Sequence, residues 1–409
     1  MTKNCRISGD KLIKFLDLGR QPLGNGFLNS KKKFSKEYFY NLRVGFSKKS
    51  SMVQLLQAPK KEKMFNNNYA FYSSTSKFMD DHFKKFSKEI KNFISKNKIK
   101  NPSIVEIGSN DGIMLKRFKN YQHLGIEPAK NVALECRKKN NCNVLIEFFS
   151  DKTINKIIKK FDKKVDVYYS TNVVGHIEDI RSVFLNISKS LSENGILILE
   201  DPYLGEIIRK NSYDQIYDEH VYFFSLMSIS KLAKMYDLQL FDASQQSTHG
   251  GSMRYYICKN RKYQKTSRLI KLLNNEKKLK LEKLNTYKQF AKRVLNSKIK
   301  LIELLKSLKK ENKTIYAYGA TAKSTTIFNF CKINERLINF YFDNTKIKQN
   351  KYSPGMHIKV KSFKKLKNYP DYFFLSAWNH KNEILNKEKT YVKKGGKWIT
   401  HIPDVRIIK

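Results

Sequence analysis

Two stretches in the middle of the chain concentrate side chains that could move a proton. Residues 213–220 read Tyr-Asp-Gln-Ile-Tyr-Asp-Glu-His, and residues 248–254 read Thr-His-Gly-Gly-Ser-Met-Arg. Histidine titrates near neutral pH and therefore suits the removal of a weakly acidic C–H proton beside a ketone. Tyrosine, histidine and asparagine can donate hydrogen bonds to the enolate oxygen that forms. Glu219 could orient the neighbouring ring of His220 or raise its basicity.

A third candidate segment runs from Asn172 to His176 and follows a strand-like run at residues 165–169. Open α/β sheets bind their ligands at the carboxyl ends of parallel strands, where this segment would lie. Each histidine taken alone is more commonly a hydrogen-bonded structural residue than a catalytic one. The clustering of several histidines with acidic and aromatic side chains favours a shared catalytic site.

A glycine-containing turn at residues 108–112 has the composition of a nucleoside-binding loop. It follows Glu106, and glycine lets the backbone approach a ligand while the acid can pair with an ammonium group. It lacks the G-x-G-x-x-G pattern of dinucleotide sites, and the plainer alternative is a turn beside a satisfied acid. Glu127 closes the next strand, where a carboxylate can accept both ribose hydroxyls. The combination predicts S-adenosylmethionine as cofactor, held by Glu106, Gly108, Asn110, Asp111, Gly112, Glu127, Pro128 and Asn172.

The elements that would position these segments alternate between strands and helices. Parallel strands need crossover connections, so this alternation predicts a doubly wound parallel sheet. A Lys/Leu-rich stretch at residues 266–311 predicts one long amphipathic helix or two. A second alternating unit follows it. The expected strands of the first unit are residues 103–107, 122–126, 144–148, 165–169 and 195–200, and those of the second are residues 314–318, 338–342, 371–375 and 397–401.

We therefore predict an α/β protein with a small N-terminal unit and two Rossmann-like domains. In the second domain, the turn before residue 324 joins a strand to a helix, so its N–H groups and Lys323 could hold a diphosphate. An ordinary turn with an exposed lysine is the alternative. Asn379 is a hydrogen-bonding candidate in the same cleft. The expected domains are residues 1–62, an S-adenosylmethionine-binding domain at 63–260 with its active-site segment at 201–260, a helical connector at 261–311, and the C-terminal domain at 312–409.

The composition of the 409 residues excludes disorder and fibrous structure, because 40% are hydrophobic and 13% aromatic. Lys+Arg 81 against Asp+Glu 36 gives a net charge of +45, which ordinarily suggests a nucleic-acid partner. The lysines, however, are spread evenly along the chain with many Asn and Ile. We therefore expect no nucleic-acid partner. The alternative is a basic nucleic-acid-binding protein in which the enzyme fold is a relic without catalytic function.

The five cysteines show no pairing pattern, which fits a reducing compartment. The N-terminus lacks the apolar core of a signal peptide, and no apolar run approaches the ~20 residues that cross a bilayer. The sequence therefore predicts a cytoplasmic protein without a membrane partner.

Across essentially its whole length the sequence resembles the S-adenosylmethionine-dependent C-3 methyltransferases that act on nucleotide-linked 4-keto-deoxyhexoses. The matching stretches are residues 18–23, 105–115, 200–205, 213–220, 249–252, 318–324 and 377–380. The resemblance implies that the keto sugar lies between the two α/β units. It also implies that His220 is the base at C3 and that Tyr217 and His176 lie near the ketone oxygen.

The resemblance further places an active-site tyrosine in residues 69–74. Phe71 stands where relatives often carry tyrosine, so either Tyr69 or Tyr72 would take that role. Glu219 would adjust the basicity of His220. The expected catalytic residues are therefore His220, Tyr217, Glu219, His176, Tyr72 and Tyr69. The expected substrate contacts are His249, Gly250, Lys323 and Asn379.

Relatives carry a structural zinc between two C-x-x-C pairs, and this chain departs from that pattern. Its pairs read Cys-Arg-Ile-Ser at residues 5–8 and Ser-Lys-Lys-Ser at residues 47–50, so one thiol remains. Serine is a far poorer zinc ligand than cysteine, and one thiolate cannot form a closed site. We therefore predict no metal, and a unit held by the packing of Leu12, Phe15, Leu16, Leu18, Leu23 and Phe46.

The expected function is transfer of a methyl group from S-adenosylmethionine to C3 of a nucleotide-linked 4-keto-deoxy sugar through a base-generated enolate. The alternative within enzymes is methylation of another sugar position or of an oxygen acceptor. A degenerate, inactive methyltransferase is disfavoured because every residue needed for the chemistry is present.

Overall fold

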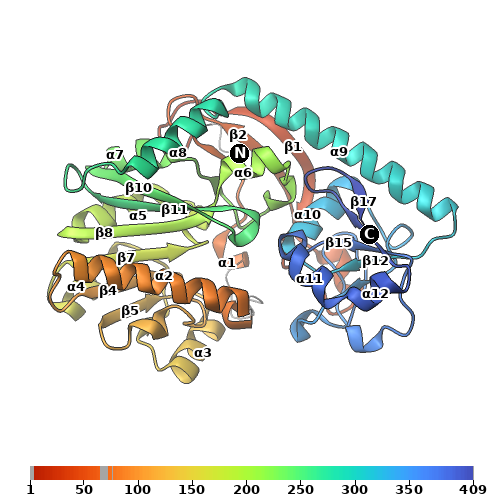
Figure 1. Cartoon of the computed structure of the whole chain (residues 1–409), viewed down its shortest axis with the longest axis horizontal. Coiled ribbons are helices and arrows are strands. Elements are labelled where there is room, and N and C mark those ends of the chain that lie inside the picture. Colours follow the sequence, from red (N-terminus) through yellow and green to blue (C-terminus); the bar gives the residue numbers. More distant parts are fainter. Residues whose placement is uncertain (1–3, 65–71, 76, 409) are drawn as a thin grey trace.

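The computed structural model describes residues 4–64, 72–75 and 77–408. Figure 1 shows two α/β bodies, with a β-layer and the long helix α9 (Leu284–Lys310) running along one side from the first body to the second. The described helices include none long and apolar enough to span a membrane.

The first body contains a seven-stranded sheet in the order β10-β11-β8-β7-β4-β5-β6. The strands from β8 to β6 are parallel, whereas β11 and β10 add antiparallel at one edge. The predicted parallel sheet is confirmed, except that the strand expected at residues 144–148 ends at Leu145. The bounds are β4 (Ser103–Ile107), β5 (Gln122–Ile126), β6 (Val144–Leu145), β7 (Val165–Thr171), β8 (Leu191–Pro202), β10 (Leu238–Gln246) and β11 (Ser252–Lys259).

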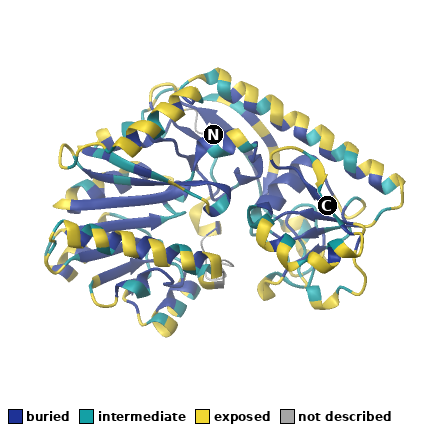
Figure 2. Cartoon of the chain, viewed as in Figure 1, coloured by how far each residue is buried: buried dark blue, intermediate teal, exposed yellow. Residues whose placement is uncertain are grey.

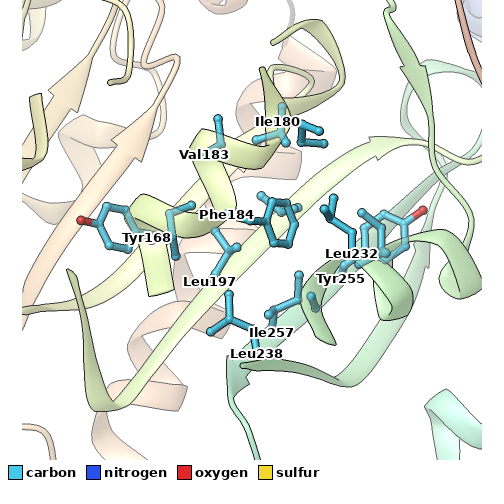
Figure 3. Packing of buried hydrophobic residues seen from close by; sticks show 14 of the residues in the cluster. Tyr168, Ile180, Val183, Phe184, Leu197, Leu232, Leu238, Tyr255 and Ile257 are labelled. Atoms are coloured by element: carbon cyan, nitrogen blue, oxygen red, sulfur yellow. The ribbon is translucent and has the colours of Figure 1, made fainter. Parts of the chain in front are cut away.

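Helices cover both faces of this sheet, as a doubly wound fold requires. On one face α2 buries Phe83, Phe86 and Ile90 at helical spacing against the strands. On the other, Figure 3 shows Val183 and Phe184 packed among side chains of β8, β10, β11 and α7. The helices are α1 (Lys61–Met64), α2 (Lys77–Lys96), α3 (Lys130–Asn140), α4 (Asp151–Phe161), α5 (Ile180–Ser190), α6 (Leu204–Lys210), α7 (Leu226–Lys234) and α8 (Ser267–Lys278).

The N-terminal segment forms an antiparallel sheet that a distant strand completes. Its order is β1 (Ile13–Pro22), β2 (Phe39–Phe46), β3 (Val53–Leu55) and β9 (Tyr222–Phe223). Because β9 begins two residues after His220, this sheet holds one end of the candidate active-site segment. Of the predicted packing residues, Leu12, Leu16, Leu18 and Phe46 are buried. Phe15 is half-buried but packs against the same core, next to Tyr287, whereas half-buried Leu23 belongs to none of the hydrophobic clusters of the described residues.

The C-terminal body has a six-stranded sheet that is parallel apart from its last strand. The order is β14 (Val360–Lys361), β13 (Tyr341–Phe342), β12 (Ile315–Tyr318), β15 (Tyr372–Leu375), β16 (Lys397–Thr400) and β17 (Arg406–Ile408). Its helices are α10 (Ala322–Cys331), α11 (Lys381–Lys387) and α12 (Lys389–Lys393). All of α10 after its first residue, Ala322, is buried, whereas Figure 2 shows α9 with a long exposed outer face. The stretch predicted as one or two helices is therefore two, α8 and α9.

Candidate active site

A cavity of about 1030 Å³ lies where the carboxyl ends of β4, β5, β7 and β8 face the start of α10. Most residues predicted for cofactor, substrate and catalysis line it, although they come from both α/β bodies. The lining includes Glu106, Gly108, Asn110, Glu127, Pro128, Asn172, His176, Tyr217, Glu219, His220, His249, Lys323 and Asn379.

Four predicted residues do not line this cavity. Asp111 and Gly112 turn toward α3, where the Asn140 side chain donates to the Asp111 carbonyl. Gly250 packs instead against the ring of Trp378. The hydroxyl of Tyr72 accepts a hydrogen bond from Asn131 Nδ2 at 2.9 Å. Tyr69, the other tyrosine considered for catalysis, lies outside the described residues.

The glycine turn is fastened to the end of β5 by Glu127. The backbone N–H of Asn110 donates to Glu127 Oε2 at 2.9 Å, and the N–H of Ala129 donates to Oε1 at 2.9 Å. Gly108 has a φ of 76°, and a Cβ there would lie 2.3 Å from Val173 Cγ2, so only glycine fits. The sequence therefore sets both the shape of the turn and its position over β5.

Two buried carboxyl groups flank the turn. Burial raises the pKa of Glu127 to about 7. Burial also raises the pKa of Glu106 well above its usual range, although the Tyr169 hydroxyl donates to Glu106 at 2.9 Å. Carboxylates held in so little water gain most from further hydrogen-bond donors. Ribose hydroxyls and an ammonium group are donors of that kind.

Ser73 and Ser74, in the stretch that the resemblance places in the active site, contact the glycine turn through their backbone. The N–H of Ser73 donates to Asn110 Oδ1 at 3.0 Å, and the N–H of Ser74 donates to Asp111 Oδ2 at 3.1 Å. Asp111 thus helps to hold this stretch in place, although it does not line the cavity.

His220 is oriented by a backbone carbonyl. Its Nδ1 lies 2.7 Å from the carbonyl oxygen of Gln215. A carbonyl can only accept, so Nδ1 carries the proton and Nε2 keeps its lone pair. The ring lies close to those of Tyr217 and His176, with centroid separations of 4.1 and 5.2 Å. Burial, followed by the nearby His176, lowers the pKa of His220 well below its usual value, so the ring is neutral.

The two acids before His220 bind the N-terminal segment. Asn25 Nδ2 donates to Glu219 Oε1 at 2.8 Å, and the N–H of Gly24 donates to Asp218 Oδ1 at 2.8 Å. The contact that orients His220 comes from the Gln215 carbonyl, whereas Oε1 of Glu219 accepts from Asn25. Asn25, which lines the cavity, carried no recognisable sequence signal.

Two lysines face the cavity near the start of α10. Lys323 lies in the first turn, after the Thr321 capping box, and its ammonium is 5.1 Å from the ring centroid of Trp378. Burial lowers the pKa of Lys323 to about 8. Lys348 donates to the carbonyl of Ala320 at 2.8 Å and also lines the cavity. Lys348 had no sequence pattern to mark it. Two cations beside a helix N-terminus suit an anionic group.

A buried ionic cluster behind the cavity centres on Glu200 at the end of β8. Arg254 Nη2 donates to Glu200 at 2.6 Å, His82 Nε2 lies 2.7 Å away, and the Thr248 hydroxyl donates at 3.0 Å. Thr248 begins the turn in which His249 has a φ of 51° and reaches the cavity. The cluster therefore fixes α2, β11 and the His249 turn to one strand end.

Three family descriptions together match most of the chain. "Putative zinc binding domain" matches residues 5–65, "Methyltransferase domain" matches residues 79–242, and "C-methyltransferase C-terminal domain" matches residues 247–403. The C-methyltransferase NovU of Streptomyces niveus is 26% identical over 409 residues, covering 99% of this chain and 96% of its own.

Among solved structures, an S-adenosylmethionine-dependent methyltransferase from Clostridium acetobutylicum is 12% identical, with a TM-score of 0.35, over 44% of this chain and 92% of its own. The plantazolicin methyltransferase BpumL is 16% identical, with a TM-score of 0.37, over 50% of this chain and 91% of its own.

Proposed function

Because the chain belongs to the C-methyltransferases and is an S-adenosylmethionine-dependent enzyme of that family, we propose that it methylates C3 of a nucleotide-linked 4-keto-deoxy sugar. The observation that carries the proposal is the tautomer of His220, whose Nδ1–H is held by Gln215. It leaves a basic nitrogen in the same cavity as the glycine turn.

In the proposed reaction His220 Nε2 removes the proton from C3, next to the ketone. The low pKa of His220 means that the basic form is present at neutral pH, without prior loss of a proton. The imidazolium that forms is next to Tyr217, whose ring lies against His220. General bases placed in this way typically contribute about 100- to 10,000-fold.

The negative charge that develops on the ketone oxygen needs donors. Burial raises the pKa of the Tyr217 phenol well above its usual value, so the hydroxyl keeps its proton and can donate. Burial also lowers the pKa of His176 to about 4, so this ring is neutral and carries one N–H. We assign both side chains to the oxygen, because both line the cavity beside His220.

The cofactor would be held at the glycine turn. Glu127 would accept from the ribose, while Glu106 would face the ammonium group; Gly108, Asn110, Pro128 and Asn172 complete the contact surface. When bound, the sulfonium supplies the electrophilic methyl group. Asp111 and Gly112 shape the turn without facing the cavity.

The anionic part of the substrate would lie across the cavity at the second α/β body. Lys323 and Lys348 supply positive charge there, beside the N-terminus of α10. His249 and Asn379 also line this part of the cavity and would contact the sugar. Gly250 supports the site from behind, against Trp378.

Mass spectrometry with a labelled methyl donor and a panel of nucleotide-linked 4-keto-deoxy sugars tests this proposal. We expect one labelled methyl group on C3 of at least one member. A label on oxygen or on another carbon would support the alternative, an enzyme acting on a different acceptor atom. The cytoplasmic location expected from the sequence remains part of the proposal.

A further inference from the structure

Four side chains in the segment that matches the putative zinc binding domain converge on one point. Cys5 Sγ lies 3.3 Å from Ser50 Oγ, and Ser50 Oγ lies 2.8 Å from Ser47 Oγ. Ser8 Oγ lies 3.3 Å from Ser47 Oγ. The two residues between the members of each pair match the spacing of a four-ligand zinc site, and the contacts link all four side chains in the order Cys5, Ser50, Ser47 and Ser8.

The residues at these positions do not fit zinc. A closed structural site needs four thiolate or imidazole ligands, and serine hydroxyls keep their protons at neutral pH. Cys5 is the only thiol of the four. Within the described residues, no group of three or more His, Cys, Asp and Glu side chains is placed to hold a metal ion.

A carboxylate instead joins the two loops. Asp10 Oδ1 accepts hydrogen bonds from Ser8 Oγ at 2.5 Å and from Ser47 Oγ at 2.7 Å. The backbone carbonyl of Asp10 accepts from the N–H of Cys5 at 2.7 Å. Asp10 therefore links the loop before β1 to the loop after β2 through hydrogen bonds to both of its ends.

We propose that a hydrogen-bond network centred on Asp10 has replaced the metal of this unit, and that the four positions still form a metal-site geometry that lacks three of its four thiols. The network links loops of the sheet β1-β2-β3-β9. The last of these strands, β9, begins two residues after His220. The fold of the site segment is therefore independent of zinc.

The unmodified protein gives the first test. After purification without added metal it should contain far less than one zinc per chain, and EDTA should leave its thermal unfolding midpoint unchanged. About one zinc per chain, or a midpoint lowered by EDTA, would overturn the proposal.

Asp10→Asn gives the second test. Loss of a charged acceptor shared by two serines should lower the unfolding midpoint by roughly 3 °C. Asp81→Asn, at an exposed position on α2, is the matched control and should not shift it. Equal midpoints for the two variants would refute the role of Asp10.

Restoring the thiols gives the third test. Ser8→Cys combined with Ser47→Cys and Ser50→Cys should bind one zinc, and Co²⁺ should produce a thiolate charge-transfer band. Adding Cys5→Ser to this variant should weaken metal binding by orders of magnitude. A folded triple variant that binds no metal would contradict the retained geometry; if it does not fold, the EDTA and Asp10→Asn experiments still decide.

Discussion

The imidazole Nδ1 of His220 lies 2.7 Å from the carbonyl oxygen of Gln215, and this contact decides which nitrogen of the ring is basic. Gln215 and His220 belong to one turn between α6 and β9, so the acceptor is fixed by the local backbone. The basic nitrogen is therefore defined before any substrate binds.

His220→Asn should lower kcat about 1,000-fold, because asparagine cannot take up a proton. Affinity for S-adenosylmethionine should stay within a few-fold, since the glycine turn does not depend on His220. Steady-state kinetics and calorimetric titration measure the two effects. His357→Asn, at a histidine paired with Glu37 outside the cavity, is the control. Lost cofactor affinity in the His220 variant would reassign the residue.

The charge of Lys323 should set the alkaline limit of activity. Its pKa, lowered by burial to about 8, means that the ammonium is charged below that pH and neutral above it. If the ammonium holds the anionic part of the substrate, kcat/KM should fall as the pH rises through about 8. The arginine of Lys323→Arg stays charged, so the alkaline limb of the pH profile, where kcat/KM falls, should move to higher pH. An unchanged limb in the arginine variant would remove Lys323 from substrate binding.

Binding of S-adenosylmethionine should depend on the ionisation of Glu127. The pKa of about 7 means that the carboxylate form dominates at pH 8 and is about a tenth of the protein at pH 6. The apparent affinity should therefore be roughly tenfold weaker at pH 6. Calorimetric titration measures it. Glu127→Gln should bind about 10- to 100-fold more weakly, and without this pH dependence.

Glu200→Gln should destabilise the protein. Burial alone would raise the pKa of Glu200, but His82 and Arg254 outweigh it and lower the pKa to about 2. The carboxylate therefore stabilises the fold above pH 4.5, and this contribution is lost as the pH falls toward 2. At neutral pH the variant should lose about 3–5 kcal/mol of unfolding free energy, because buried Arg254 loses its buried carboxylate and keeps only Glu89, which is half exposed.

Denaturant unfolding between pH 7 and pH 3 checks the Glu200 prediction. Glu193→Gln on the same strand is the control, because Glu193 is exposed and pairs with Lys259 at the surface. Its stability should match that of the unmodified protein. Equal losses in the two variants would show that the buried cluster carries no special stabilisation.

The sequence predicted the parallel strands well because each is a short apolar run after a helical segment. It missed β10 and β11, whose polar faces and a register shift near Leu240 hide a simple alternation. It also extended β6 beyond Leu145, because Phe148 continues the apolar run after the strand has ended and lines the cavity.

Site residues in short motifs were predicted, whereas those brought in by long-range contacts were not. Asn25 reaches Glu219 across 194 residues, and Lys348 reaches Ala320 across 28. No local pattern encodes either contact. The orienting acceptor of His220 was missed for another reason: a backbone carbonyl has no residue type to mark it.

Proton exchange at C3 tests the central claim most directly. The protein is incubated in deuterated water with a nucleotide-linked 4-keto-deoxy sugar that it methylates, and without methyl donor. We predict deuterium at C3 with the unmodified protein and none above background with His220→Asn. No exchange by a protein that transfers methyl groups, or equal exchange by the His220 variant, would contradict abstraction of the C3 proton by this imidazole.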